Sequence, residues 1–260
     1  MFAKKNMDYY VEFNSFFKEL TKTSSKIIKD YFKTQISVEI KKDNSPVTIA
    51  DKKAEEEIRK QIEKQFPDHG IIGEEFGTSN TNAEYQWIID PIDGTKSFIA
   101  GIPLFGTLIA LTKNKIPVLG AIHMPLLDEL AIGDNKKTFI NDKPVQISNT
   151  SKLEESVLLY TNLIDIERHQ NLNNFLNLCR RVNYSRTWGD CCGYYLLTKG
   201  KADVMIDPIM SVWDITALIP VIQGAGGIIT DYQGNTPVEA KSIVAASKNL
   251  HENIITILNS

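Results

Sequence analysis

The chain has 260 residues, of which 42% are hydrophobic, 23% charged and 9% aromatic, which is the composition of a globular protein and excludes a disordered, collagen-like or coiled-coil chain. The 29 Lys and Arg against 32 Asp and Glu give a net charge of -3, so no basic excess attracts nucleic acid or an anionic membrane. At about 150 residues per domain, this length allows one large domain or two joined halves.

The cysteines and the apolar runs favour a reduced, cytoplasmic protein. Cys179, Cys191 and Cys192 are an odd number, and two of them are adjacent, which is unfavourable for disulfide geometry. The first residues are polar and aromatic rather than apolar, so we expect no secretory leader. The longest uncharged runs, 97–112 and 215–230, contain Pro and Gly and are shorter than a membrane-spanning helix of about 20 residues.

The first half of the chain predicts helices followed by an antiparallel sheet. Apolar residues at helical spacing indicate a helix over about residues 7–33. A second helix is expected to begin at Thr48, in a capping box with Asp51, and to end at Pro67. Strands are expected at 70–72, 85–90, 104–111, 118–123 and 129–132, the last three forming a meander.

The second half alternates strands with helices. The expected strands are 157–160, 202–206, 227–230 and 243–246, and the expected helices are 167–180, 189–199, 211–223 and 250–258. The glycine cluster 224–227 follows a helix and is expected to cap it rather than to bind phosphate. The sequence therefore predicts an α+β chain of two lobes, 1–150 and 151–260.

The most informative stretch follows the second strand and reads Asp-Pro-Ile-Asp-Gly-Thr. The strand delivers Asp90 to its carboxyl end, Pro91 is expected to stop the ladder, and Asp93 follows in a turn. Two carboxylates at a strand end suit Mg²⁺, which prefers oxygen ligands, and Asp90 fits between two ions. The amides of Gly94 and Thr95 are placed to hold an anionic group beside the metals. The alternative is an ordinary Asp-Gly turn.

Further acidic residues favour the metal site. Glu74 and Glu75 follow another strand, and Asp214 falls in the first turn of a helix. Asp214 has a structural alternative, because acids stabilise helix N-termini, and Asp51 has one as the capping-box residue. The run 55–57 of three glutamates is expected to form a solvated helix face.

Three ordered motifs resemble those of the inositol monophosphatase family of Mg²⁺-dependent, lithium-sensitive phosphatases. They are Gly-Glu-Glu at 73–75, Asp-Pro-Ile-Asp-Gly-Thr at 90–95, and Trp-Asp at 213–214 before Gly-Ala-Gly-Gly. The resemblance covers nearly the whole chain, and the stretches 73–77, 101–111 and 186–191 most resemble the histidinol-phosphatase branch. It implies a layered αβαβα sandwich of the inositol monophosphatase/fructose-1,6-bisphosphatase type, with the active site between the two lobes.

The resemblance implies a set of metal ligands. Glu74, Asp90 and the carbonyl of Ile92 would hold the first ion. Asp90, Asp93 and Asp214 would hold the second, and a third would lie near Glu74. The first lobe would thus supply most metal ligands, and the second would supply Asp214 and the substrate pocket. The expected cofactor is Mg²⁺, with two or three ions per site.

The resemblance also assigns roles in catalysis. Thr95, oriented by Asp51, would position the attacking water together with Glu74. The amides of Gly94 and Thr95 would receive the phosphate. Metal ions lower the pKa of water and stabilise the leaving alkoxide, so the products would be an alcohol and inorganic phosphate.

Substrate binding is expected to involve Asp190, Asp207 and Arg186. The two acids align with positions that face the leaving group in the family, and they suit the ammonium group of an amino alcohol, consistent with L-histidinol phosphate. The alternatives are that Asp190 caps the helix near residue 189 and that Asp207 forms a turn before Pro208.

Two residues depart from the family pattern. Cys192 stands where the histidinol-phosphatase branch has an aromatic residue, and Thr216 replaces a small one. The four histidines lack metal-ligand spacing and are expected to be structural or on the surface; they are His69, His123, His169 and His251.

The sequence therefore predicts a cytoplasmic phosphomonoesterase that hydrolyses L-histidinol phosphate to L-histidinol and phosphate. The enzyme alternatives are an inositol-1-monophosphatase and a 3′(2′),5′-bisphosphate nucleotidase, and the alternative of another class is a non-catalytic binding protein of the same fold. A homodimer is expected, with no nucleic acid or membrane partner. The net charge of -3 does not exclude a phosphate ester, because two or three Mg²⁺ ions would make the acidic pocket neutral or positive.

Overall fold

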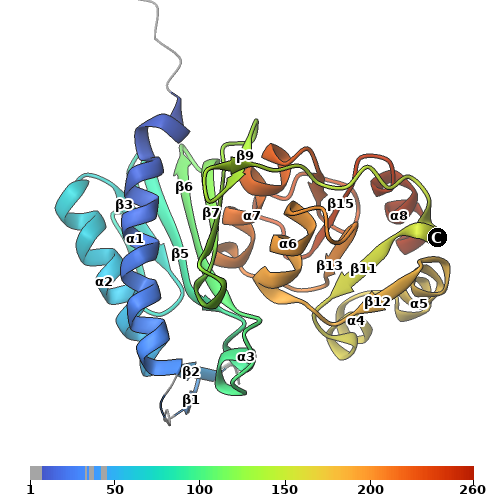
Figure 1. Cartoon of the computed structure of the whole chain (residues 1–260), viewed down its shortest axis with the longest axis horizontal. Helices are drawn as coiled ribbons and strands as arrows, with labels where there is room; N and C mark the ends of the chain where they lie inside the picture. The colour runs from blue at the N-terminus through green and yellow to red at the C-terminus, as the bar shows by residue number, and fades with distance from the viewer. Residues whose placement is uncertain (1–7, 33, 35–37, 42–45) are drawn as a thin grey trace, which may run out of the picture.

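Two β-sheets alternate with three layers of helices along the long axis of the molecule (Figure 1). The computed structural model describes residues 8–32, 34, 38–41 and 46–260. The residues on which the expectation of no leader rests, and the expected helix limits 7 and 33, lie outside this described part.

The predicted αβαβα sandwich is confirmed. The helical layers are α1 (Tyr9–Phe32) with α2 (Ile49–Gln65), then α6 (Asp190–Thr198) with α7 (Val212–Gly224), then α4 (Leu163–His169), α5 (Leu172–Arg181) and α8 (His251–Leu258). Short helical turns are α3 (Thr95–Ile99), η1 (Pro125–Leu127) and η2 (Leu153–Glu155).

The first sheet has eight strands and is antiparallel except for the pair β3 and β5. In spatial order its strands are β10 (Lys143–Pro144), β9 (Thr138–Ile140), β8 (Glu129–Gly133), β7 (Ile116–Met124), β6 (Gly106–Lys113), β5 (Tyr85–Asp93), β3 (Gly70–Gly73) and β4 (Gly77–Ser79). The predicted meander is confirmed as β6, β7 and β8. A separate ribbon pairs β1 (Val38–Ile40) with β2 (Pro46–Thr48).

The second sheet has five strands and mixes parallel with antiparallel pairs. In spatial order they are β12 (Tyr184–Arg186), β11 (Val157–Tyr160), β13 (Val204–Asp207), β15 (Ile243–Ala246) and β14 (Ile228–Thr230). Although α7 comes from the second half of the chain, it packs on the first sheet at β7. A Cβ on Gly120 would lie 2.1 Å from the Ala217 carbonyl oxygen, so only glycine permits this approach.

Two expected elements differ from the structure. The expected helix 167–180 is two helices, because Gln170 ends α4 and the Asn171 side chain caps α5 by accepting a hydrogen bond from the Asn174 amide. Pro91 does not end β5, which continues to residue 93. The register with β6 slips by one residue between Asp90 and Asp93, so Pro91, which lacks an N–H, lies in a β-bulge.

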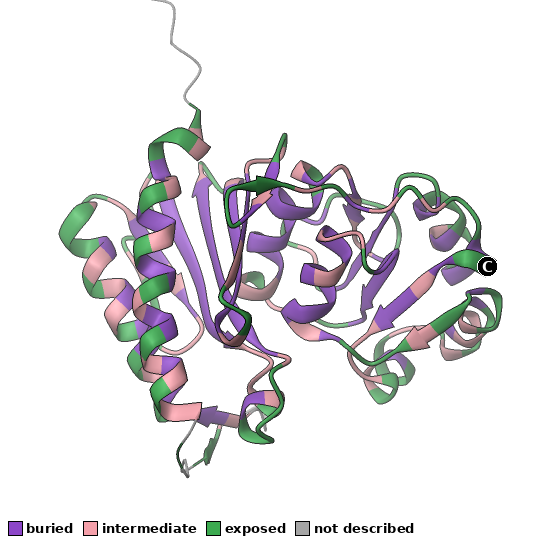
Figure 2. Ribbon diagram, in the orientation of Figure 1, coloured by how far each residue is buried: buried purple, intermediate pink, exposed green. Residues whose placement is uncertain are grey.

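Figure 2 shows that the strands of both sheets are largely buried, whereas α1 and α2 each keep an exposed outer face. Under α1, the buried ring of Trp87 lies 5.4 Å from that of Phe16 and 5.2 Å from that of Phe17, measured between centroids. These aromatic contacts fix the N-terminal helix on the sheet whose β5 carries Asp90 and Asp93. None of the helices in the described part of the chain is both long and apolar enough to cross a bilayer.

Candidate active site

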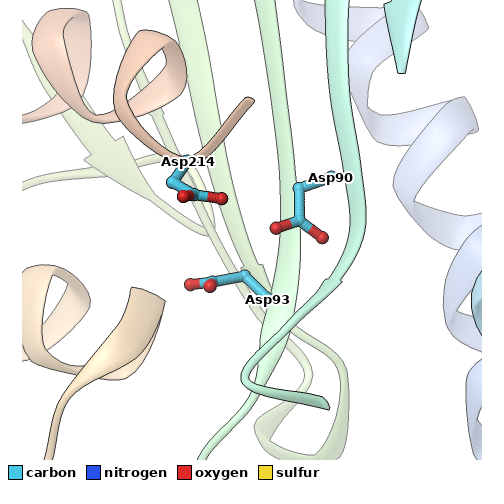
Figure 3. Close-up of side chains that lie close together, drawn as sticks. All are labelled: Asp90, Asp93 and Asp214. Atoms are coloured by element: carbon cyan, nitrogen blue, oxygen red, sulfur yellow. The ribbon is translucent and has the colours of Figure 1, made fainter. Parts of the chain in front are cut away.

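Three aspartates from two segments far apart in the sequence, β5 and the start of α7, lie close together (Figure 3). Asp90 and Asp93 flank the bulge of β5, and Asp214 lies in the first turn of α7, where its Oδ2 accepts a hydrogen bond of 2.7 Å from the Ser211 amide. One carboxylate oxygen from each aspartate lies within 4.8 Å of the others. Asp214 therefore does both things expected of it: it caps its helix and joins the acidic cluster.

The cluster is electrostatically strained without a cation. Burial raises the pKa of Asp90 well above its ordinary value, and the charges of Glu74, Asp93 and Asp214 raise it further. Burial, with Asp190 and Asp214 nearby, does the same to the pKa of Asp93. Asp90 Oδ1 is buried and has no hydrogen-bond partner among the described residues. Crowded carboxylates with an unpaired oxygen are the donor set that a divalent cation neutralises, so these residues fit a metal ion.

Glu74 lies in the turn between β3 and β4 and is held by a lysine that sequence reasoning missed. Lys41 Nζ lies 2.7 Å from Glu74 Oε1 and 2.6 Å from Glu75 Oε1. Burial acts to lower the pKa of Lys41, but its two carboxylate partners outweigh burial and raise it. Burial raises the pKa of Glu75 to about 7 even though Lys41 opposes this. In this structure the carboxylate of Glu74 is therefore paired with an ammonium group and is not part of the cluster formed by Asp90, Asp93 and Asp214.

The expectation that residues 55–57 form a solvated face is wrong for Glu55. Its side chain is fully buried, and its carboxylate accepts hydrogen bonds from Arg59 Nε (2.8 Å), the Glu75 amide (2.7 Å) and the Phe76 amide (3.2 Å). Glu55 thereby fixes the turn that carries Glu74. Arg59, four residues along the same helix, did not distinguish Glu55, because Glu56 and Lys60 have the same spacing and are exposed.

Asp51 and Thr95 lie together beside the bulge. Asp51 Oδ2 accepts a hydrogen bond of 2.8 Å from the Thr48 amide, which completes the predicted capping box. Asp51 Oδ1 lies 3.4 Å from Thr95 Oγ1, and that hydroxyl also lies 2.9 Å from the Ile92 carbonyl oxygen. Burial raises the pKa of Asp51. One carboxylate therefore caps a helix and reaches Thr95.

Gly94 shapes the turn before α3. Its φ of +89° is in the left-handed region, and a Cβ there would lie 2.8 Å from the Leu104 carbonyl oxygen. Both the positive φ and the short contact with the Leu104 carbonyl oxygen exclude even a small side chain here. The turn that follows Asp93 can therefore take this form only with glycine at position 94.

A pocket of about 80 Å³ opens beside the cluster. Its lining includes Asp93 and Asp214 of the cluster, three further acids, and five polar or apolar residues; the further acids are Asp165, Asp190 and Asp207. Asp190 does not cap its helix, since Gly189 is the N-cap and makes no side-chain cap. Burial raises the pKa of Asp190 to about 6, against the opposing charge of Lys96. Asp165 was not among the predicted site residues.

Asp207 is the last residue of β13, whereas the alternative to its substrate-binding role was a turn; its carboxylate accepts a hydrogen bond of 3.0 Å from the Tyr194 hydroxyl. Burial raises its pKa to about 8. Arg186 is exposed on β12, stacks over the Tyr184 ring at 5.1 Å and is not among the described residues that line the pocket. Its role in substrate binding stays a prediction.

The two departures from the family pattern are both accommodated. Cys192 is buried, and the amide of the neighbouring Cys191 donates a hydrogen bond to Asp93 Oδ2. Thr216 Oγ1 donates a 2.6 Å hydrogen bond to the Val212 carbonyl on its own helix. His69 Nδ1 accepts a hydrogen bond from Trp87 Nε1, which is the structural role expected of it.

Comparison with known proteins gives a consistent result. Residues 10–260 match the inositol monophosphatase family. The chain is 38% identical over 248 residues to a histidinol-phosphatase of Chlorobaculum parvum, covering 93% of this chain and 95% of that one. It is 39% identical over 236 residues to the bifunctional phosphatase IMPL2 of Arabidopsis thaliana, covering 89% of this chain and 68% of that one.

Solved structures agree with the sequence comparison. An inositol monophosphatase from Zymomonas mobilis superposes with a TM-score of 0.87 at 30% identity, covering 98% of this chain and all of that one. The family is metal-dependent, and the aspartate cluster offers oxygen ligands for such an ion. The chain therefore belongs to the inositol monophosphatase family and is a phosphoric monoester hydrolase.

Proposed function

We propose that this phosphatase is Mg²⁺-dependent and that its substrate is a phosphorylated amino alcohol, L-histidinol phosphate. The observation that carries the substrate is the group of three acids, Asp165, Asp190 and Asp207, that line the pocket beyond the metal-binding aspartates. Acids in this pocket favour a leaving group that carries a positive charge, because a bound ammonium group would oppose the raised pKa values of Asp190 and Asp207 and stabilise their charged forms. The name of the Chlorobaculum parvum relative supports the same substrate.

The metal ligands of this proposal are acids and one carbonyl that lie around the bulge. Glu74, Asp90 and the Ile92 carbonyl would hold one ion, Asp90, Asp93 and Asp214 would hold the second, and a third would bind near Glu74. Bound Mg²⁺ lowers the pKa of a water molecule towards neutrality and stabilises the leaving alkoxide. Calorimetric titration with Mg²⁺ tests the ion count, and a stoichiometry of one would refute the two-metal arrangement.

Thr95 positions the attacking water in this proposal. A hydroxyl has one proton and two lone pairs. Because Asp51 and the Ile92 carbonyl are both acceptors within reach of that proton, the Thr95 oxygen keeps its lone pairs for a hydrogen bond from water. Glu74 orients the same water, and the amides of Gly94 and Thr95 bind the phosphate.

A substrate panel tests the proposed specificity. L-Histidinol phosphate, inositol-1-phosphate and adenosine 3′,5′-bisphosphate should be compared by phosphate release, with kcat/KM highest for the first. Asp190→Asn is expected to lower kcat/KM for L-histidinol phosphate by about tenfold, the effect of one lost charge-assisted contact, while changing kcat/KM for inositol-1-phosphate little. A higher kcat/KM for inositol-1-phosphate in the unaltered enzyme would favour the inositol-1-monophosphatase alternative instead.

The proposal also covers the two lobes of the chain and its oligomeric state. Residues 1–150 and 151–260 form two lobes that share one active site, and the enzyme works as a homodimer in the cytoplasm. Unequal susceptibility of the two lobes to limited proteolysis tests the division. Sedimentation velocity tests the dimer, and a single species at the 29.3 kDa monomer mass would contradict it.

A further inference from the structure

A second polar groove lies on the far side of the first sheet, between α1, the end of β7 and the turn η1. Its volume is about 630 Å³, within the roughly 300–1,000 Å³ range of small-molecule sites. None of the acids assigned to the active site lines it. Its wall is built from one face of α1, where lysines recur at helical spacing, namely Lys18, Lys22, Lys26 and Lys29.

The groove is positive although the protein is negative overall. Its four lysines face two acids in the lining, Asp30 and Asp128, so its formal charge is +2, against -3 for the whole chain. Lys18 pairs with Asp142 at 2.6 Å, and Lys29 pairs with Asp128. Lys22 and Lys26 are exposed and have no ion-pair partner in the described part of the chain. Two ammonium groups are thus available to a ligand.

A buried histidine forms part of the groove lining. His123, on β7, is 6% exposed and lines the groove, and its Nδ1 atom has no hydrogen-bond partner among the described residues. A buried polar group without a partner is unfavourable, so such groups usually face a ligand, ion or water. The imidazole and the two unpaired lysines thus bring polar groups to the groove from two separate elements, a strand and a helix.

We propose that this groove binds a small anion with several negative charges, of the oligophosphate class, at a site separate from the active site. The two unpaired ammonium groups favour an anion with more than one negative charge, because each ammonium can then pair with a charge of its own. The occupant is small because Asp30 and Asp128 line the same groove as the lysines and the net negative charge of the chain repels a long polyanion.

Calorimetry with inorganic tripolyphosphate tests this site on the full chain kept free of divalent metal. Without metal, the aspartate cluster repels anions, so the heat of binding reports on the groove. One tripolyphosphate is expected to bind per chain, and orthophosphate is expected to bind much more weakly. The double variant Lys22→Ala with Lys26→Ala should weaken tripolyphosphate binding by about tenfold or more, since it removes two charged donors.

The matched control is Lys60→Ala with Lys64→Ala, which removes two exposed lysines at the same spacing from the neighbouring helix α2. This variant should bind tripolyphosphate as the unaltered chain does. Both double variants should keep the kcat/KM of the Mg²⁺-loaded enzyme, because none of these lysines lies in the active site. The proposal is overturned if tripolyphosphate fails to bind, if both double variants weaken it equally, or if a long single-stranded RNA binds where tripolyphosphate does not.

Discussion

Replacing Glu55 by glutamine tests how the turn that carries Glu74 is held. The Glu55 carboxylate is fully buried, and it accepts hydrogen bonds from Arg59 and from the amides of Glu75 and Phe76. A glutamine side chain would point an NH₂ group at one of these donors and would remove the charge that pairs with Arg59, itself only 11% exposed. Breaking charged hydrogen bonds around a buried pair costs about 3 kcal/mol, so the free energy of unfolding should fall by that amount.

Urea unfolding followed by circular dichroism measures this loss, and Glu56→Gln is its matched control. Glu56 is the next residue of the same helix, but it is exposed, and its ion-pair partner in the described part of the chain is the exposed Lys60. Its substitution should therefore leave the unfolding free energy unchanged. Because Glu55→Gln loosens the turn, it should also raise the Mg²⁺ concentration needed for half-maximal activity. Equal unfolding free energies for the two variants would refute the reasoning.

Three further substitutions probe the site. Asp93→Asn should keep the circular dichroism spectrum and lower kcat by about a thousandfold, since a lost metal contact costs several kcal/mol; full phosphate release would sink the metal assignment. Burial raises the folded-state pKa of Asp207 to about 8 from 3.8, so its ionisation opposes folding as pH rises through that window. The unfolding temperature of Asp207→Asn should therefore exceed that of the parent by more at pH 9 than at pH 5, and parallel profiles would contradict this. Gly94→Ala should lower the unfolding free energy by about 2 kcal/mol or more, whereas Gly101→Ala, with φ of +72° and open space around its Cβ, should cost only about 1 kcal/mol; equal losses would show that the Leu104 contact is unimportant.

Local signals in the sequence predicted much of the architecture. The capping box of Thr48 with Asp51 marked the start of α2, and the apolar runs 157–160 and 243–246 are strands with the predicted limits. Short edge strands such as β4, β10 and β12 were missed, because three residues or fewer carry no readable periodicity. The layered fold followed from ordered motifs rather than from these local patterns.

The acids of the site were predicted unevenly, for a physical reason. Asp90, Asp93 and Asp214 stand next to strand and helix ends, where local sequence indicates their position. Glu55 lies inside a helix. Its carboxylate is buried because it accepts hydrogen bonds from backbone amides of a turn about 20 residues further along the chain. Lys41 likewise meets Glu74 only because the fold brings the two segments together. Such tertiary pairings leave no pattern in the local sequence.

The bulge in β5 determines whether Asp90 and Asp93 lie on the same face of the sheet. Side chains three residues apart on a regular strand point to opposite faces. Asp90 and Asp93 nevertheless pair with Leu108 and Gly106, which are two apart, so the extra residue restores them to one face of the sheet. It also leaves Pro91 and Ile92 unpaired with β6. The Pro91 carbonyl accepts a hydrogen bond from the Thr107 hydroxyl, and the Ile92 carbonyl accepts one from the Thr95 hydroxyl. A straight strand with the acids two apart would keep the carboxylate pair but would commit the carbonyls that face β6 to the ladder. The inserted residue provides the pair and also leaves carbonyl oxygens beside it.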